Sequence, residues 1–78
     1  MSSSVETPAD LGRAVRRARR RRDLRQEDLA LSAGTGVRFI GELERGKPTV
    51  QLAATLRVLQ ALGCTLVLDD GAGDDDDA

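Results

Sequence analysis

Glycine is dense in the stretch AGTGVRFIGELERGKPT, residues 33–49, which contains four glycines in seventeen residues. Gly34 and Gly36 form a G-x-G pair, and this pattern has two chemical meanings. It can form a loop that cradles a phosphate group, or it can let a helix lie close to a second helix or to DNA. The neighbouring residues therefore decide between an enzyme and a DNA-binding protein.

Both phosphate-binding patterns fail on the residues that surround these glycines. A dinucleotide-binding fingerprint needs a third glycine where this chain has Phe39, and it needs a preceding strand where this chain has a helical pattern. A Walker loop needs Ser or Thr after Gly-Lys, but Gly46-Lys47 is followed by Pro48. A nucleotide-binding loop is therefore not indicated.

The remaining explanation for the glycines is geometric. Gly34 suits a tight turn between two short helices, because glycine adopts the left-handed conformation without strain. Gly36 and Gly41 leave room for the backbone to approach something large. Gly41 costs about 1 kcal/mol of helix stability relative to Ala, so its presence predicts a close contact. Either DNA or a partner helix would explain that contact.

The near-neutral net charge of −1 hides a strong asymmetry. Residues 69–78 hold six of the 13 acidic residues and no cation, which leaves 12 basic and 7 acidic residues, a net of +5, in residues 1–68. Eight cations fall in residues 13–25. Such a block is typical of a nucleic-acid partner, although a solvated helix face fits the charge equally well. No apolar run is long enough to span a membrane and no signal-peptide pattern is present, so we expect a cytoplasmic protein.

The composition argues against catalysis and against metal binding. The 78 residues include one cysteine, Cys64, and no His, Tyr or Trp, so neither an internal disulfide, nor a structural zinc site, nor a nucleophile–base pair is indicated. Asp74–Asp77 lacks the spacing of a calcium loop. We expect no enzyme activity, cofactor, metal or small-molecule ligand. About sixty residues can fold, and so small a core favours support from a second copy of the chain.

Hydrophobic spacing and capping residues divide the chain into three parts. Residues 1–7 and 69–78 are expected to be disordered, and residues 8–68 to form one domain. Thr7, Pro8 and Asp10 predict a helix start by a cap and a capping box. We expect helices over 8–22, 26–33 and 36–45, the last capped by Thr35, and a fourth from Thr49 to about 62, followed by a strand over 64–68.

The segment QEDLALSAGTGVRFIGELER, read from Gln26, resembles the helix-turn-helix of the Xre, or Cro/phage-repressor-like, family. The family pattern is matched by a small residue early in the first helix, a glycine in the turn, apolar residues on the second helix and an E-x-G-K ending, which are here Ala30, Gly34, Ile40, Leu43 and Glu44-Arg45-Gly46-Lys47. Two helices that cross steeply through a short turn need small and apolar residues at those places. Thr35 departs from the pattern, since the family usually has an apolar residue there.

A narrower resemblance, to the HipB-type antitoxins, covers roughly residues 8–68. It is carried by RRARRRRDLRQEDLA, GVRFIGELERGKPTVQL and LRVLQALG followed by a strand. It implies a mainly α fold of four to five short helices with one C-terminal strand that pairs across a homodimer. It also implies an antitoxin that binds operator DNA, represses its own operon and binds a HipA-type serine/threonine kinase toxin. A stand-alone Xre-type regulator without a toxin, and a protein-interaction module that does not bind DNA, remain alternatives.

The resemblance also implies the contact residues. The second helix of the motif enters the major groove by its N-terminal end, where the exposed positions are Gly36, Val37, Arg38, Gly41 and Glu42. Arg38 suits a bidentate contact to guanine and Val37 suits a thymine methyl group. Glu42 either accepts from cytosine or holds Arg38 or Arg45 in place. The expected phosphate contacts are Gln26, Arg45, Lys47 and Thr49.

Three further expectations are structural. Arg19 and Glu44 match a family pair that forms a buried salt bridge between the first and third helices. Phe39 is expected to pack into the core more readily than to contact DNA. The strand Cys64, Thr65, Leu66, Val67 and Leu68 is expected to pair antiparallel with the same residues of a second chain, because an unpaired apolar strand is a template for another.

Overall fold

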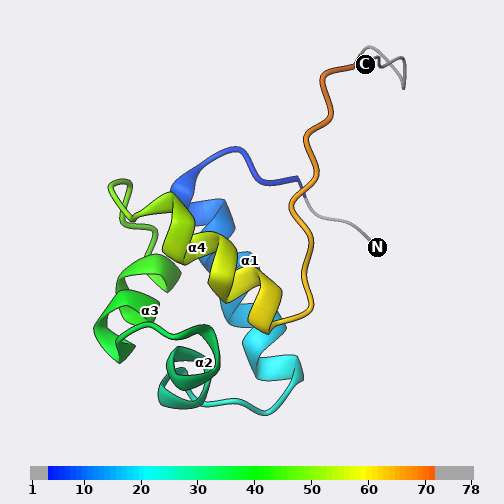
Figure 1. Ribbon diagram of the computed structural model, residues 1–78. Helices are drawn as coiled ribbons and strands as arrows, with labels where there is room; N and C mark the ends of the chain where they lie inside the picture. The colour runs from blue at the N-terminus through cyan, green and yellow to red at the C-terminus, as the bar shows by residue number, and fades with distance from the viewer. Residues whose placement is uncertain (1–3, 72–78) are drawn as a thin grey trace.

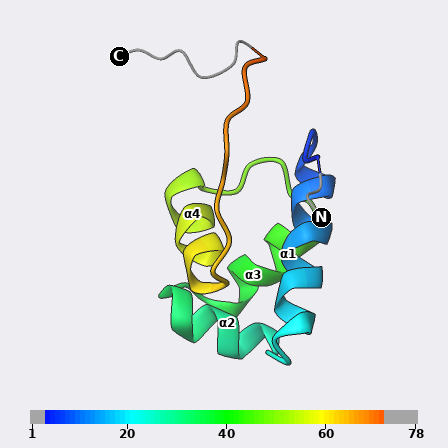
Figure 2. The same cartoon turned by 90° about the vertical axis from the view of Figure 1, so that its right-hand side faces the viewer.

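The computed structural model describes residues 4–71 and contains four helices over that range (Figure 1). They are α1 (Pro8–Arg21), α2 (Gln26–Ala33), α3 (Val37–Glu44) and α4 (Leu52–Ala61). α1 and α4 lie along opposite sides of the bundle, with α2 and α3 between and below them (Figure 2). Residues 1–3 and 72–78, with most of the expected disordered tail and the Asp74–Asp77 run, lie outside the described part of the chain.

The start of α1 is set by a reciprocal pair of hydrogen bonds, as its sequence predicts. The backbone N–H of Asp10 donates to Thr7 Oγ1 at 3.0 Å, and the backbone N–H of Thr7 donates to Asp10 Oδ2 at 3.2 Å. Pro8 occupies the first turn, where its missing N–H leaves no hydrogen bond unmade. The backbone N–H of Glu6 also donates to the Asp10 carboxylate, and this bond is the largest cause of the lowered pKa of Asp10.

The turn between α2 and α3 differs in detail from the expectation. Gly34 ends α2 in the left-handed conformation, with φ of 73°. The expected cap of the next helix, Thr35, instead belongs to the end of α2, because its backbone N–H donates to the Ala30 carbonyl at 2.9 Å. Gly36 is the N-cap of α3, which begins at Val37 rather than at residue 36 and ends one residue early, at Glu44.

From the sequence, Thr49 is expected to cap the fourth helix, but the N-cap of α4 is Gln51, so that expectation is wrong. Thr49 lies in the exposed turn that precedes α4. Within α4 the hydroxyl of Thr55 donates to the Gln51 carbonyl at 2.8 Å, which places a buried polar side chain on a backbone partner.

The core is built from all four helices. Its fully buried side chains are Val15 of α1, Leu29 of α2, Ile40 and Leu43 of α3, Val58 of α4 and Leu62 just after it. Burying each of these side chains contributes roughly 1.5–3 kcal/mol, which holds the short helices α2 and α3 where neither would be stable alone. Phe39 is partly buried against this core, as expected. No helix within residues 4–71 is long and apolar enough to cross a membrane.

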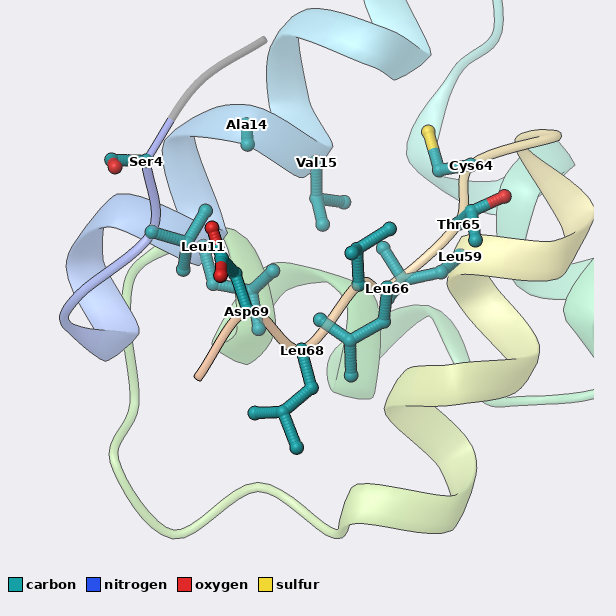
Figure 3. A pocket seen from close by; sticks show the side chains of 12 residues that line it. Ser4, Leu11, Ala14, Val15, Leu59, Cys64, Thr65, Leu66, Leu68 and Asp69 are labelled. Atoms are coloured by element: carbon teal, nitrogen blue, oxygen red, sulfur yellow. The ribbon is translucent and has the colours of Figure 1, made fainter. Parts of the chain in front are cut away.

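The expected C-terminal strand is absent, and this part of the fold prediction is wrong. Residues 64–68 are extended but belong to no sheet, and no other segment among residues 4–71 forms a strand. Cys64 is half-buried, whereas Thr65, Leu66, Val67 and Leu68 are exposed. The segment runs over a groove lined by Leu11, Ala14 and Val15 of α1 and Leu59 of α4 (Figure 3). β-prone residues give a strand only when a second strand accepts their backbone hydrogen bonds, and here helices are the neighbours.

Candidate nucleic-acid interface

α2, the turn Gly34–Gly36 and α3 form a helix-turn-helix unit. Leu29 and Ala30 on α2 and Ile40 on α3 are buried in the same apolar cluster. The small side chain of Ala30 lets the two helices approach closely. The N-terminal end of α3 lies at the edge of the molecule (Figure 1). This packing fixes α3 through its C-terminal half and leaves its first turn accessible.

The first turn of α3 presents one apolar and one cationic side chain. Val37 is 50% exposed. The side chain of Arg38 is 90% exposed. A substituent on Gly36, the N-cap before them, would meet no atom within 4 Å, so this glycine makes no close approach inside the chain. The accessible face of the first turn of α3 is therefore small and positively charged, and its N-cap carries no side chain.

Glu42, one turn further along α3, joins two cations. Its Oε2 accepts from Arg38 Nε at 3.3 Å and lies 3.4 Å from Lys47 Nζ. The Arg38 and Lys47 side chains otherwise project into solvent, with 90% and 46% of their surfaces exposed. Two roles were expected for Glu42, a contact to cytosine or a contact that holds a neighbouring arginine. The contacts within the chain match the second role, with Arg38 as the arginine.

The guanidinium of Arg45 lies over Gly41. A Cβ built on Gly41 would be 3.2 Å from Arg45 Nη1, and Gly41 itself is buried. Glycine at this position therefore makes room for the side chain of Arg45, the C-cap residue of α3, and leaves no open space at the surface. Thr49 and Lys47, in the segment between α3 and α4, are exposed.

Glu44, the last residue of α3, connects three helices. Arg19 Nε on α1 donates to Glu44 Oε2 at 2.6 Å, and Arg19 Nη2 donates to Oε1 at 3.0 Å. Gln26 Nε2, at the start of α2, donates to Oε1 at 3.1 Å. The side chain of Glu44 is only 4% exposed and that of Arg19 11%. The side-chain amide of Gln26 is thus occupied within the chain, while its backbone N–H belongs to the free first turn of α2.

The charge state of this cluster follows from its surroundings. Burial raises the pKa of Glu44, but hydrogen bonds from Arg19 and Gln26 and the charges of Arg19 and Arg16 outweigh it, so the pKa lies below the ordinary value of 4.5. The hydrogen bond to Glu44 raises the pKa of Arg19 above its usual range. Both groups are therefore ionised at neutral pH, and a fully bonded ion pair fixes the angle between α1 and α3.

Two glycines position α3, and of these only Gly12 was not singled out in the sequence. A Cβ on Gly12 of α1 would lie 2.5 Å from the Leu43 carbonyl oxygen, so α1 touches the backbone of α3 directly. Gly46, with φ of 85°, turns the chain after α3 against Ala9, whose Cα would be 2.8 Å from a Cβ. The available signal for Gly12 was a glycine inside a helix, on the same face as Val15 and Arg19.

The fold and this surface define the class of protein. A helix-turn-helix whose second helix offers an exposed, cationic first turn is the arrangement of a DNA-binding protein. Residues 10–70 match the helix-turn-helix domain family. The uncharacterized HTH-type transcriptional regulator y4mF of Sinorhizobium fredii is 52% identical over 66 residues, which cover 85% of this chain and 87% of that protein. The chain belongs to the helix-turn-helix family of DNA-binding transcriptional regulators.

Solved structures with the same fold include two HipB complexes. One is a HipB–O4 20mer complex, and the other is a HipA–HipB–O2–O3 complex. Both match with a TM-score of 0.82 and 23% sequence identity, over 90% of this chain and 99% of the matched chain. At that identity the likeness is one of fold, and it agrees with the resemblance found in the sequence.

Proposed function

We propose that this protein reads operator DNA through the first turn of α3. The observation that carries the proposal is the exposure of Val37 and Arg38 at the free end of a helix whose other end is buried. In the docking geometry of this motif, that end enters the major groove. Arg38 then reaches guanine O6 and N7, Val37 contacts a thymine methyl group, and Gly36 allows the backbone to come close.

Glu42 positions the reading arginine. Its carboxylate accepts from Arg38 and also lies beside Lys47, so it restricts two long side chains that would otherwise move freely. A side chain already held in place loses less entropy on binding. A direct contact from Glu42 to cytosine N4 would require this carboxylate to give up at least one of its cations.

The phosphate contacts surround that reading surface. Lys47, Thr49 and Arg45 are exposed near the end of α3, and Gln26 contributes its backbone N–H at the positive end of α2. The Gln26 side chain, bonded to Glu44, fixes the helix end that carries this N–H. These groups set the orientation of the protein on DNA and carry no base preference themselves.

The protein acts as a homodimer in this proposal. About sixty folded residues give a marginal core, and the exposed side chains of Leu66, Val67 and Leu68 lie beside an apolar groove between α1 and α4 (Figure 3). Exposed apolar surface of this kind favours a partner. Two copies related by a two-fold axis would present two α3 helices to an inverted repeat, with half-sites about 34 Å or a multiple of it apart.

The finer biological role is that of an antitoxin that represses its own operon and binds a HipA-type kinase toxin. It is supported by the resemblance of residues 8–68 to the HipB-type antitoxins and by the likeness in fold to HipB in complexes with DNA and with HipA. The second candidate is a regulator without a toxin, which the name of the relative y4mF favours. Copurification from the native host decides between them: a kinase in the complex supports the antitoxin role, and its absence supports the regulator.

The reading surface is tested by titrating the protein with DNA from upstream of its own gene. Arg38→Ala should weaken binding by roughly 1–3 kcal/mol and relax the preference at one base pair. Arg45→Ala is the comparison, because loss of a phosphate contact should weaken binding to all sequences equally. Unchanged sequence preference in Arg38→Ala would remove Arg38 from the reading residues.

A further inference from the structure

α1 carries more cations than the helix-turn-helix uses. Its fourteen residues include six arginines and a single acid, Asp10. Arg19 is paired with Glu44 and Arg13 with Asp10. Arg16 and Arg20, one turn apart, are exposed, and neither side chain has a hydrogen bond or ion pair with any residue from 4 to 71.

This arrangement costs the fold stability. Like charges four residues apart on a helix repel each other by a few tenths of a kcal/mol. Arg16 and Arg20 are exposed, and neither belongs to the core cluster. Their presence therefore calls for an anionic partner that the single chain does not contain.

The position of the two side chains indicates where that partner lies. Gly12 marks the line along which α1 touches the backbone of α3 at Leu43. At about 100° per residue, Arg16 and Arg20 lie about 40° and 80° around the helix from Gly12. Both are thus on the side of α1 next to its contact with α3, Arg16 about one turn and Arg20 about two turns beyond Gly12, and α1 runs along an edge of the molecule (Figure 2). The charge of Arg16 also acts on the Glu44 carboxylate.

We propose that Arg16 and Arg20 form a second phosphate-binding surface on α1, which holds the DNA backbone next to the half-site read by α3. The proposal rests on the proposed function, because DNA must already lie against α3. The surface continues a row of DNA-facing groups that begins at the N-terminus of α2, since Gln26 is bonded to Glu44 and Arg16 acts on that same carboxylate. Two arginines about 6 Å apart along the helix suit successive charges of a polyanion.

Duplex DNA fits this surface better than an acidic polypeptide does. The Arg16/Arg20 surface adjoins the N-terminus of α2, where backbone amides can bind a phosphate. A polyanion lying there would contact the arginines and these amides together, without a change in the fold. The contacts carry no base specificity, so they should add affinity and salt dependence to every sequence alike.

The test uses the full chain and two double variants. Arg16→Gln/Arg20→Gln removes the proposed surface. Arg17→Gln/Arg21→Gln is the matched control, with the same charge change and the same four-residue spacing, but about 140° and 180° around the helix from Gly12. Melting temperatures confirm that both variants fold. Binding is measured at a series of salt concentrations to the upstream fragment, to an unrelated duplex of equal length and to poly-glutamate.

We expect the first variant to lower the slope of log K against log salt by about two, one for each phosphate contact, equally for both duplexes. A hydroxyl-radical footprint should lose one protected backbone segment beside the half-site, while the control keeps both the slope and the footprint. Equal losses in both variants would mean a diffuse charge effect and overturn the proposal.

Two other outcomes separate this proposal from the proposed function. In the first outcome, the wild type prefers the upstream fragment, and the Arg16/Arg20 variant has the same salt slope and footprint as the wild type. That result would overturn only the second surface. Absence of any preference in the wild type would overturn specific reading at α3, and the slope on the unrelated duplex would still test Arg16 and Arg20. If that variant loses binding to poly-glutamate alone, the partner is an acidic protein and the DNA proposal fails.

Discussion

At the scale of single residues, the glycine at position 12 and the carboxylate of Glu44 hold α3 in place. Gly12 lets α1 touch the backbone of α3, whereas Gly41 only makes room for the side chain of Arg45, the C-cap residue of α3. Glu44 then fixes the crossing through Arg19 and Gln26. The contacts of Gly12 and Glu44 lie at the C-terminal end of α3, away from the first turn, so in the proposed DNA reading they act by positioning the helix.

Gly12→Ala should destabilise the protein by roughly 1–3 kcal/mol, because the added Cβ would lie 2.5 Å from the Leu43 carbonyl oxygen and backbone must shift. Gly41→Ala is the control. Its Cβ meets only the flexible end of Arg45, so the gain in helix propensity of up to about 1 kcal/mol should make it neutral or stabilising. Urea unfolding measures both. Equal effects of the two substitutions would show that the contact at Gly12 is not limiting.

The Glu44 ion pair predicts a pH dependence of stability. Because its pKa in the folded protein lies below the ordinary 4.5, the pair stabilises the fold above that value, and this contribution is lost as pH falls through the folded pKa. Glu44→Gln should lower the free energy of unfolding by roughly 1.5–3 kcal/mol at pH 7, as expected for a hydrogen bond to a charged group. The difference from wild type should shrink below pH 4.5 in urea titrations at several pH values. A constant difference down to pH 3 would contradict the assignment.

At the scale of elements, each helix is short and depends on its ends. α2 and α3 have eight residues each, so core burial rather than intrinsic propensity keeps them helical. α1, with fourteen residues and a complete capping box, is the longest helix of the described chain and the one on which α3 rests. A substitution at the start of α1 should therefore lower the stability of the whole helix-turn-helix.

Thr7→Ala should cost about 1 kcal/mol, because the backbone N–H of Asp10 loses the acceptor that caps the helix. Thr7→Ser keeps the hydroxyl and should retain most of the stability. Thermal unfolding followed by circular dichroism compares the two. If Ser and Ala behave alike, the Thr7 hydroxyl does not stabilise the helix start.

At the scale of the whole molecule, a small core and an exposed apolar segment both favour association. Leu66, Val67 and Leu68 are 60%, 75% and 94% exposed, an unusual state for three neighbouring apolar side chains. If the homodimer proposed above forms, unfolding is coupled to dissociation, and the melting temperature must rise with protein concentration. Leu66→Ser with Leu68→Ser should remove that dependence. A melting temperature independent of concentration from 1 to 100 μM would show a monomer.

The sequence by itself determined the parts of this protein that depend on near neighbours in the chain. Thr7 with Asp10 begins α1 and Gly34 ends α2, since capping bonds act over three or four residues. The resemblance of one continuous segment, read from Gln26, to the Xre family predicted the helix-turn-helix. The DNA-reading positions proposed above also come from that family pattern.

The tertiary structure alone decided what depends on elements far apart in the chain. That Gln26 shares the Glu44 carboxylate and that Gly12 lies against the backbone of α3 both follow from how the helices cross. The strand over 64–68 was predicted wrongly for this reason. A strand requires backbone hydrogen bonds to a second strand, and that partner is set by packing, whereas a helix makes its own hydrogen bonds within the segment that encodes it.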